Sequence, residues 1–268
     1  MKSEAMVTAG LPEVSHPVVR LFGAYSRHYM RRRFHAIRIP RNGQPPREGA
    51  RPLVIYLNHA SWWDPLVCLY LSRKWFPERT SFAPIDAFSL RQYRFFKHLG
   101  LYGVEQHSTR GALTFLRTTR AILESKRNVV WMTPQGRFKD VRERPLRLQR
   151  GIGALAVQTE DVEFLPLAVE YAFWTEPRPE ILVSFGEPVI PSEEPRRSAD
   201  RWTEFFSDAL EEAQDELASR SCRRDPTEWL VIDKGASGVS ASYDAWRRLR
   251  ARLSGAEFAR EHQPEKRA

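Results

Sequence analysis

Alternation between short apolar runs and longer helical segments is the feature that most constrains the fold of this 268-residue chain. LVIYL (53–57) and VVWMT (129–133) have the length and the apolar content of buried strands. Helix patterns follow most of the strand candidates, and such alternation predicts an α/β domain. We therefore expect a mixed, mostly parallel sheet flanked by helices, with an N-terminal amphipathic basic helix and further helices at the C-terminal end.

The expected elements divide the chain into three segments. The expected strands are 53–57, 80–84, 101–105, 129–133, 163–171 and 180–186, and the expected helices are 64–76, 86–99, 108–126, 148–159, 197–220 and 240–253. The last two strands are expected to pair antiparallel near an edge of the sheet, and Pro166, which has no N–H to donate, argues against a central position. We expect a tail and basic segment at 1–47, a core at 48–195, and a helical extension and tail at 196–268.

The segment from Val14 to Arg47 contains eight arginines and no acidic residue. Within it, residues 17–31 predict a helix with arginines on one face and an apolar stripe on the other. The stripe consists of Val18, Leu21, Phe22, Tyr25 and Tyr29. Two interpretations are open: a surface helix packed on its own domain, and a helix lying in a membrane interface, where basic side chains attract anionic lipid. The absence of acidic side chains favours the interface.

No stretch of the sequence predicts a transmembrane span. The best candidate, 52–72, carries His59 and Asp64 near its middle, and Pro65 would break the helix. The N-terminus has no charged region followed by an apolar one, so we expect no secretory signal. These features predict a cytoplasmic protein that binds peripherally to the inner face of the membrane.

The net charge of +9 and the pI of about 9.8 favour anionic partners. Nucleic acid, anionic lipid headgroups and phosphate-bearing substrates all fit such a charge. The sequence contains no zinc-finger, RRM or helix-turn-helix pattern, so we expect no nucleic-acid partner. Cys68 and Cys222 are the only cysteines and lie far apart, which excludes a disulfide framework and a thiolate metal site, and we expect no metal.

The stretch NHASWWDP (58–65) places His59 and Asp64 directly after an expected strand. Sites in α/β sheets gather where strands end and helices begin. A carboxylate on one imidazole nitrogen would leave the other nitrogen able to take a proton from a hydroxyl. The same residues fit a structural role, in which Asp64 caps a helix opened by Pro65 and His59 is buried in the core. Spacing alone leaves both interpretations open.

NHASWWD (58–64) is followed by four further blocks of recognisable pattern. They are WMTPQGRF (131–138), LQRGIGALA (148–156), FLPLAVEY (164–171) and VSFGEPV (183–189). In this order the five blocks resemble the N-H-x-S-x-x-D, F-P-E-G-T-R, K-x-G-x-x-x-A, V-P-V-x-I and I-G-x-P-I motifs of the glycerolipid acyltransferase family. That family includes the 1-acyl-glycerol-3-phosphate and lysophospholipid acyltransferases. The resemblance covers about residues 50 to 192.

The resemblance implies an O-acyltransferase that moves a fatty acyl group from acyl-CoA or acyl carrier protein to a lipid hydroxyl. His59 would be the general base and Asp64 would orient it, with no enzyme nucleophile and no cofactor beyond the acyl donor. The implied substrate-binding residues lie in the motif loops. They are Asn58, Ser61, Gln106, Arg110, Pro134, Gln135, Gly136 and Arg137. The expected partners are the acyl donor, a lipid acceptor and an anionic membrane surface.

Three positions depart from the family's pattern. Gln135 stands where the motif has Glu, Phe138 where it has Arg, and Gln106 where a second block, GLYGVEQ (100–106), should end in Arg. The two missing arginines are the expected clamps for a phosphate group. Two interpretations of Arg110, Arg137 and Lys139 are open: replacements for the missing arginines, and ordinary surface charges.

These departures leave the acceptor open. A lysophospholipid-like acceptor is favoured. The alternative is a glycosylated carotenoid or another lipid without phosphate, because SWWD (61–64), TPQG (133–136) and the segment 168–188 are similar to a branch of the family associated with acylating glycosylated carotenoids. A non-catalytic membrane-surface binding module would explain 14–47 without using His59. A hydrolase with the same two residues would form product without an acceptor alcohol.

Overall fold

The computed structural model describes residues 11–46, 49, 51–159 and 161–235. Eight strands form one sheet in the order β4-β3-β5-β2-β6-β7-β1-β8. The strands are β1 (Ala36–Pro40), β2 (Leu53–Leu57), β3 (Thr80–Asp86), β4 (Leu101–Val104), β5 (Asn128–Met132), β6 (Glu163–Ala172), β7 (Glu180–Phe185) and β8 (Trp229–Lys234). Neighbouring strands run parallel except for the pairs β6–β7 and β1–β8. The predicted mixed, mostly parallel α/β sheet is confirmed.

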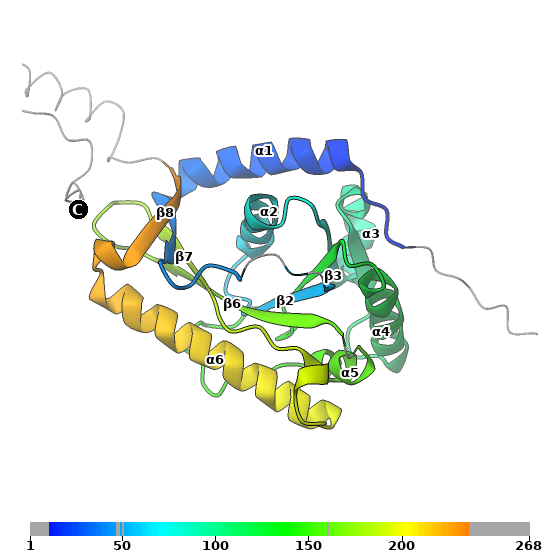
Figure 1. Cartoon of the computed structure of the whole chain (residues 1–268). Helices are drawn as coiled ribbons and strands as arrows, with labels where there is room; N and C mark the ends of the chain where they lie inside the picture. Colours follow the sequence, from blue (N-terminus) through cyan, green and yellow to red (C-terminus); the bar gives the residue numbers. More distant parts are fainter. Residues whose placement is uncertain (1–10, 47–48, 50, 160, 236–268) are drawn as a thin grey trace, which may run out of the picture.

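Helices cover both faces of this sheet (Figure 1). The helices are α1 (His16–Arg33), α2 (Asp64–Trp75), α3 (Ala87–Gln92), α4 (Thr109–Leu123), α5 (Gly151–Gln158) and α6 (Ala199–Arg223). α1 and α2 share a hydrophobic cluster with one face, and α4, α5 and α6 share a second cluster with the other. The sheet is therefore the middle layer of three.

Burial on both faces explains why the central strand β2 is a continuous apolar run. Its side chains alternate between the two clusters: Leu53, Ile55 and Leu57 pack toward α1 and α2. Val54 and Tyr56 pack toward α4, α5 and α6. Full burial of one such aliphatic side chain stabilises the fold by about 1.5–3 kcal/mol. β2 consequently lies in the middle of the sheet. The residues that follow it therefore lie at the carboxyl edge of the sheet.

The predicted apolar stripe of α1 is divided between the core and the surface. Phe22 and Tyr29 pack against the hydrophobic cluster under α1 and α2. Leu21 and Tyr25, two other members of the stripe, are 75% and 59% exposed. The fully buried positions of α1 are Gly23, Ser26 and Met30. The side of α1 that faces the protein therefore includes only part of the predicted stripe.

Two further expectations differ from the structure. The expected helix 86–99 is interrupted at Tyr93, where α3 has ended and a 3-10 helix (Arg94–His98) follows. The predicted antiparallel pairing of β6 and β7 is confirmed, but both strands lie inside the sheet, β6 between β2 and β7, and β7 between β6 and β1. The backbone of Pro166 faces β7, because its carbonyl accepts from Gly186 N–H at 3.0 Å. The β6–β7 ladder begins only at Leu167, so the missing N–H of Pro166 leaves no ladder hydrogen bond unmade.

The sheet takes strands from all three predicted segments. β1, from 1–47, lies between β7 and β8, and β8, from 196–268, is the last strand at that end of the sheet. Arg27 of α1 donates to the two carboxylate oxygens of Asp233 in β8 at 2.8 and 3.0 Å, which joins these segments further. The expected helix 240–253 lies outside the described residues. Every helix in the described part of the chain is too short or too polar to span a bilayer.

Candidate active site

Asn58 anchors the turn between β2 and α2 to the neighbouring strand β6. Asn58 Nδ2 donates to Val169 O at 2.9 Å, and Val169 N–H donates to Asn58 Oδ1 at 2.8 Å. The Asn58 residue is 2% exposed. Because its amide is committed to the backbone, Asn58 holds the start of this turn at the carboxyl edge of the sheet.

The His59 imidazole and the Asp64 carboxylate are hydrogen-bonded across the same turn. His59 Nδ1 lies 2.7 Å from Asp64 Oδ2. Ser61 N–H donates to the same carboxylate oxygen at 3.0 Å, and Tyr171 O–H donates to Asp64 Oδ1 at 2.7 Å. The Asp64 side chain is 1% exposed, whereas the His59 side chain is 19% exposed. A buried carboxylate therefore orients an imidazole that solvent can reach.

The expectation that Asp64 caps α2 is wrong. Trp63 occupies the capping position, and Asp64 is the first residue of the helix, followed by Pro65. The Asp64 carboxylate turns back to His59 and Ser61, which precede the helix. The positive end of the α2 dipole also favours a negative charge at this place. Helix geometry and the imidazole thus stabilise the same carboxylate.

This geometry sets the tautomer of the His59 imidazole. An ionised carboxylate accepts hydrogen bonds and donates none, so we assign the proton to Nδ1. His59 Nε2 then keeps a free lone pair. A neutral imidazole in this state can accept a proton from a hydroxyl, and a neighbouring carboxylate stabilises the imidazolium that forms.

A second loop, between β5 and α5, encloses the backbone of His59. Gln135 Oε1 accepts from His59 N–H at 2.7 Å, and His59 O accepts from Lys139 N–H at 2.9 Å. The loop turns at Gly136, whose φ of +70° lies in the left-handed region that glycine adopts readily. Gln106 Nε2 donates to Gly136 O at 3.4 Å and links this loop to the residues after β4. Gln106, Gln135 and Gly136 therefore gather around His59.

Known proteins resemble this chain in sequence and in fold. The family model described as Acyltransferase matches residues 32–170, which is just over half of the chain. This chain belongs to the acyltransferase family. The predicted family and the predicted enzyme class are therefore confirmed, and the protein is an acyltransferase.

One solved structure shows how the acyltransferase resembles its relatives in three dimensions. The crystal structure of the 1-acyl-sn-glycerophosphate (LPA) acyltransferase PlsC from Thermotoga maritima matches with a TM-score of 0.51 and 14% sequence identity. The match covers 75% of this chain and 79% of that chain. Because the sequence identity is low, this match shows that the two proteins share a fold. A search of the curated proteins finds no matching sequence.

Aromatic side chains border His59 of the acyltransferase. The Phe138 ring lies against the imidazole, with centroids 4.2 Å apart and planes inclined by 39°, and Phe138 is 58% exposed. Trp63 packs inward, with its ring centroid 4.9 Å from that of Phe34. Trp62 is 63% exposed. The two neighbouring tryptophans therefore differ, since Trp63 contributes to the core and Trp62 faces solvent.

Two arginines of the acyltransferase remain available to an anion. Arg110 lies in the first turn of α4 and Arg137 follows Gly136, and both are exposed. Within the described residues, neither guanidinium forms an ion pair. Lys139, in contrast, is paired with Glu143.

Pro134 and Ser61 support the backbone of the site. Pro134 is buried, and its carbonyl accepts from Gln149 N–H at 2.7 Å. Ser61 Oγ accepts from Trp63 N–H at 3.3 Å, which fits the helix-start hydrogen bond that its position suggests. Both contacts fix the loops that carry His59 and Gln135.

Sequence reasoning missed Tyr171, the donor to the second oxygen of Asp64. Burial raises the pKa of the Tyr171 phenol well above its ordinary value, and the charge of Asp64 and their hydrogen bond raise it further. The phenol therefore keeps its proton and stays a donor. The available signal was its place near the end of a strand, but the contact required the order of β2 and β6 in the sheet.

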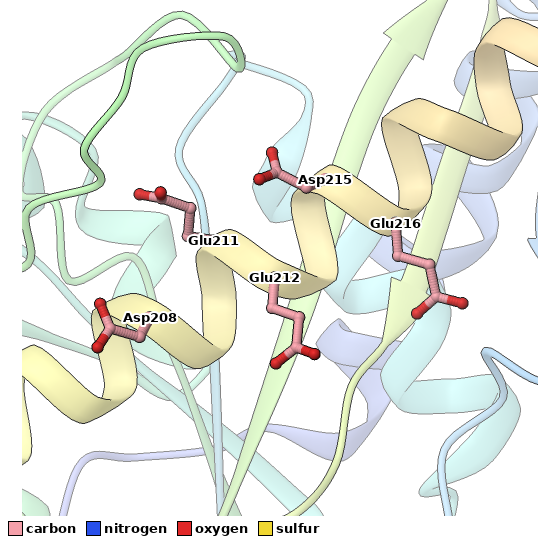
Figure 2. A pocket seen from close by; sticks show the side chains of 5 residues that line it. All are labelled: Asp208, Glu211, Glu212, Asp215 and Glu216. Atoms are coloured by element: carbon pink, nitrogen blue, oxygen red, sulfur yellow. The ribbon is translucent and has the colours of Figure 1, made fainter.

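Figure 2 shows a hollow that lies elsewhere, on α6. Its lining side chains are Asp208, Glu211, Glu212, Asp215 and Glu216. α6 covers the face of the sheet opposite to α2 (Figure 1), so this hollow is not part of the His59 site. Asp215 pairs with Arg144, and Glu211 accepts from Leu146 N–H. Among the described residues, no three His, Cys, Asp or Glu side chains are grouped to hold a metal ion.

Proposed function

We propose that this acyltransferase moves a fatty acyl group from acyl-CoA or acyl carrier protein to the hydroxyl of a lysophospholipid-like lipid. The observation that carries the proposal is the 2.7 Å contact between His59 Nδ1 and Asp64 Oδ2 at the carboxyl edge of the sheet. The activity in the name of the Thermotoga maritima relative, acyl transfer involving 1-acyl-sn-glycerophosphate, supports this class of acceptor.

In the proposed reaction, His59 Nε2 takes the proton of the acceptor hydroxyl while the oxygen attacks the thioester carbonyl carbon. The tetrahedral intermediate then collapses and the C–S bond breaks. The departing thiolate receives the proton back from the imidazolium, so the products are an acyl ester and a free thiol. Asp64 stabilises the imidazolium between the two proton transfers. No bond forms between the acyl group and the enzyme.

Thiol release from acyl-CoA in the presence and absence of lipid acceptors tests this proposal. We expect acceptor-dependent release by the wild-type enzyme and a loss of about 10²–10⁴-fold in His59→Ala, because a general base contributes about that much. His98→Ala is the matched control, since His98 is partly exposed in the 3-10 helix and pairs with Glu13 rather than Asp64. Equal rates for wild type and His59→Ala would contradict the assigned base, and acceptor-independent hydrolysis would identify a hydrolase.

A lipid acceptor without phosphate, such as a glycosylated carotenoid, is the second candidate. The observation that favours it is the kind of side chain found at two positions where this sequence differs from the family motifs. Phe138 lies against His59 where the motif has Arg, and Gln106 donates to Gly136 O where a second motif has Arg. Neither side chain supplies a positive charge for a phosphate.

A competition between two acceptors separates these candidates. Lysophosphatidate and a phosphate-free glycolipid are supplied together, and the acylated products are compared by mass spectrometry. Arg137→Gln supplies the second arm. If the acceptor carries a phosphate that Arg137 binds, this variant raises KM for lysophosphatidate and leaves KM for the glycolipid unchanged. Acylation of the glycolipid alone would support the second candidate.

We further propose that the enzyme is cytoplasmic and binds peripherally to an anionic membrane through the outer side of α1. Leu21 and Tyr25 are exposed there on a helix that carries arginines and no acidic residue. The centroid of the Phe22 ring lies 6.2 Å from that of Tyr25 and 5.3 Å from that of Phe95. The aromatic surface therefore continues from α1 onto the 3-10 helix. Apolar side chains beside basic ones are typical of interfacial helices.

Sedimentation with lipid vesicles tests this location. We expect stronger binding to vesicles containing phosphatidylglycerol than to pure phosphatidylcholine, and weaker binding at high salt. Replacing Leu21 and Tyr25 by Ser should weaken binding by about thirtyfold or more, because the two buried apolar side chains contribute more than 1 kcal/mol each. Val157→Ser on α5 is the matched control, since Val157 is 49% exposed on another helix. An equal loss in both variants would contradict the role of α1.

A further inference from the structure

The two oxygens of the Asp64 carboxylate have different partners. Oδ2 faces His59 Nδ1 and also accepts from Ser61 N–H. Oδ1 accepts from the Tyr171 hydroxyl at 2.7 Å, and no second donor to Oδ1 occurs among the described residues. Tyr171 therefore holds the end of the carboxylate that the imidazole does not contact.

The fold fixes the Tyr171 ring independently of Asp64. Tyr171 lies opposite Ile181 in the antiparallel ladder of β6 and β7. Its ring centroid lies 5.8 Å from that of Phe34, and the residue packs against the hydrophobic cluster under α1 and α2. The matched family model ends at residue 170, one residue before this tyrosine. The sheet and the cluster thus fix the position of the Tyr171 hydroxyl, to which the Asp64 carboxylate is hydrogen-bonded.

We propose that Tyr171 is a positioning residue that keeps Asp64 in the rotamer in which Oδ2 meets His59 Nδ1. The proposal rests on the proposed acyl transfer, in which Asp64 orients the general base. A carboxylate that is 1% exposed cannot replace a lost donor with bulk water. Without the hydroxyl, Oδ1 is left unsatisfied, and the carboxylate gains from turning toward other donors. The geometry of its bond to His59 is then lost.

Tyr171→Phe removes the hydroxyl and keeps the ring. We expect kcat to fall by about tenfold or more while KM for donor and acceptor stays unchanged, because partners that orient a functional side chain commonly contribute 10–100-fold. 3-Fluorotyrosine at position 171 keeps the donor and should retain wild-type activity. A Tyr171→Phe variant with the kcat of the wild-type enzyme would overturn the proposal.

Tyr102→Phe is the matched control for a lost buried hydroxyl. Tyr102 is 6% exposed, and its hydroxyl lies 2.7 Å from Thr119 Oγ1, outside the Asp64 site. Thermal melts of both variants show that each is folded and compare their stabilities. We expect similar melting temperatures and a loss of kcat in Tyr171→Phe alone. An equal loss of kcat in Tyr102→Phe would mean that the effect is a general consequence of destabilisation.

A double-mutant cycle shows whether Tyr171 acts through Asp64. In an Asp64→Asn background, Tyr171→Phe should lower kcat no further, because the two side chains contribute through one contact. Independent, multiplicative losses would overturn the proposal.

NMR of the His59 ring gives a readout that does not depend on turnover. The Nδ1-bound proton and the ring ¹⁵N shifts, assigned with His59→Gln, should move in Tyr171→Phe and stay in place in Tyr102→Phe. Coincident signals in wild type and Tyr171→Phe would overturn the proposal. If wild type transferred no acyl group to any acceptor, the proposed function would fail while this comparison would still decide the role of Tyr171.

Discussion

At the scale of single residues, the Asp64 carboxylate is 1% exposed and is hydrogen-bonded at both oxygens. A buried carboxylate without partners would cost several kcal/mol, so its donors determine where it can point. Ser61 and Tyr171 supply two of these donors from opposite sides. His59 receives its orientation from a group that is itself held in place.

Asp64→Asn tests this orientation directly. The amide can donate to the imidazole, which favours the tautomer with the proton on Nε2 and removes the base. We expect kcat to fall by up to about 10⁴-fold with a small change in melting temperature. Steady-state thiol release measures the loss. Asp140→Asn, at an exposed ion pair with Arg142, is the control and should leave kcat unchanged.

At the scale of elements, β6 links the site to the rest of the protein. Its backbone at Val169 anchors Asn58, its side chain at Tyr171 contacts Asp64, and Glu170 between them faces α6. Alternate residues of one strand point to opposite faces of the sheet. β6 therefore supports the active site on one face and packs against α6 on the other.

Glu170→Gln tests the α6 side of this strand through pH. Burial raises the pKa of Glu170, and a hydrogen bond from Ser221 Oγ at 3.1 Å opposes that rise. The folded protein thus binds this proton more tightly than the unfolded chain, so stability declines as pH rises through the folded pKa. Glutamine should raise the melting temperature at pH 7, and the gain should vanish below about pH 4. A gain of equal size at both pH values would exclude ionisation as its cause.

At the scale of the whole molecule, two hydrophobic clusters on either side of one sheet place the His59 loop and the α6 hollow on different sides. The close packing of α5 on α6 helps to fix one of these layers. A Cβ at Gly153 would lie 2.0 Å from Ala199 O of α6, so glycine is required for that contact. The active site is joined to this layer through the sheet and through the loop between β5 and α5.

Gly153→Ala should therefore destabilise the protein by about 1–3 kcal/mol, as overpacking does. Gly151→Ala is the matched control, because its Cβ would lie 3.3 Å from the movable ring of Phe115. Chemical denaturation measures both variants. Equal stabilities would show that α5 and α6 can separate without cost.

The sequence by itself determined the features that depend on neighbours along the chain. Apolar runs bounded by helix patterns predicted the mixed sheet, since each run must be buried on both faces. The pair His59 and Asp64 lies within one turn, so their spacing allowed the contact, and the resemblance to the family favoured it over a structural role. The family followed from the order of its motif blocks.

Only the tertiary structure decided the features that depend on packing. Periodicity predicted the apolar stripe of α1, but only the packing of α1 decided that Phe22 and Tyr29 contact the core while Leu21 and Tyr25 stay exposed. Pro166 suggested an edge strand, yet the end of a ladder accommodates it inside the sheet. Tyr171 lies 107 residues from Asp64, and their contact required β6 to lie beside β2. Strand order is set by the burial of all strands together, and no local pattern encodes it.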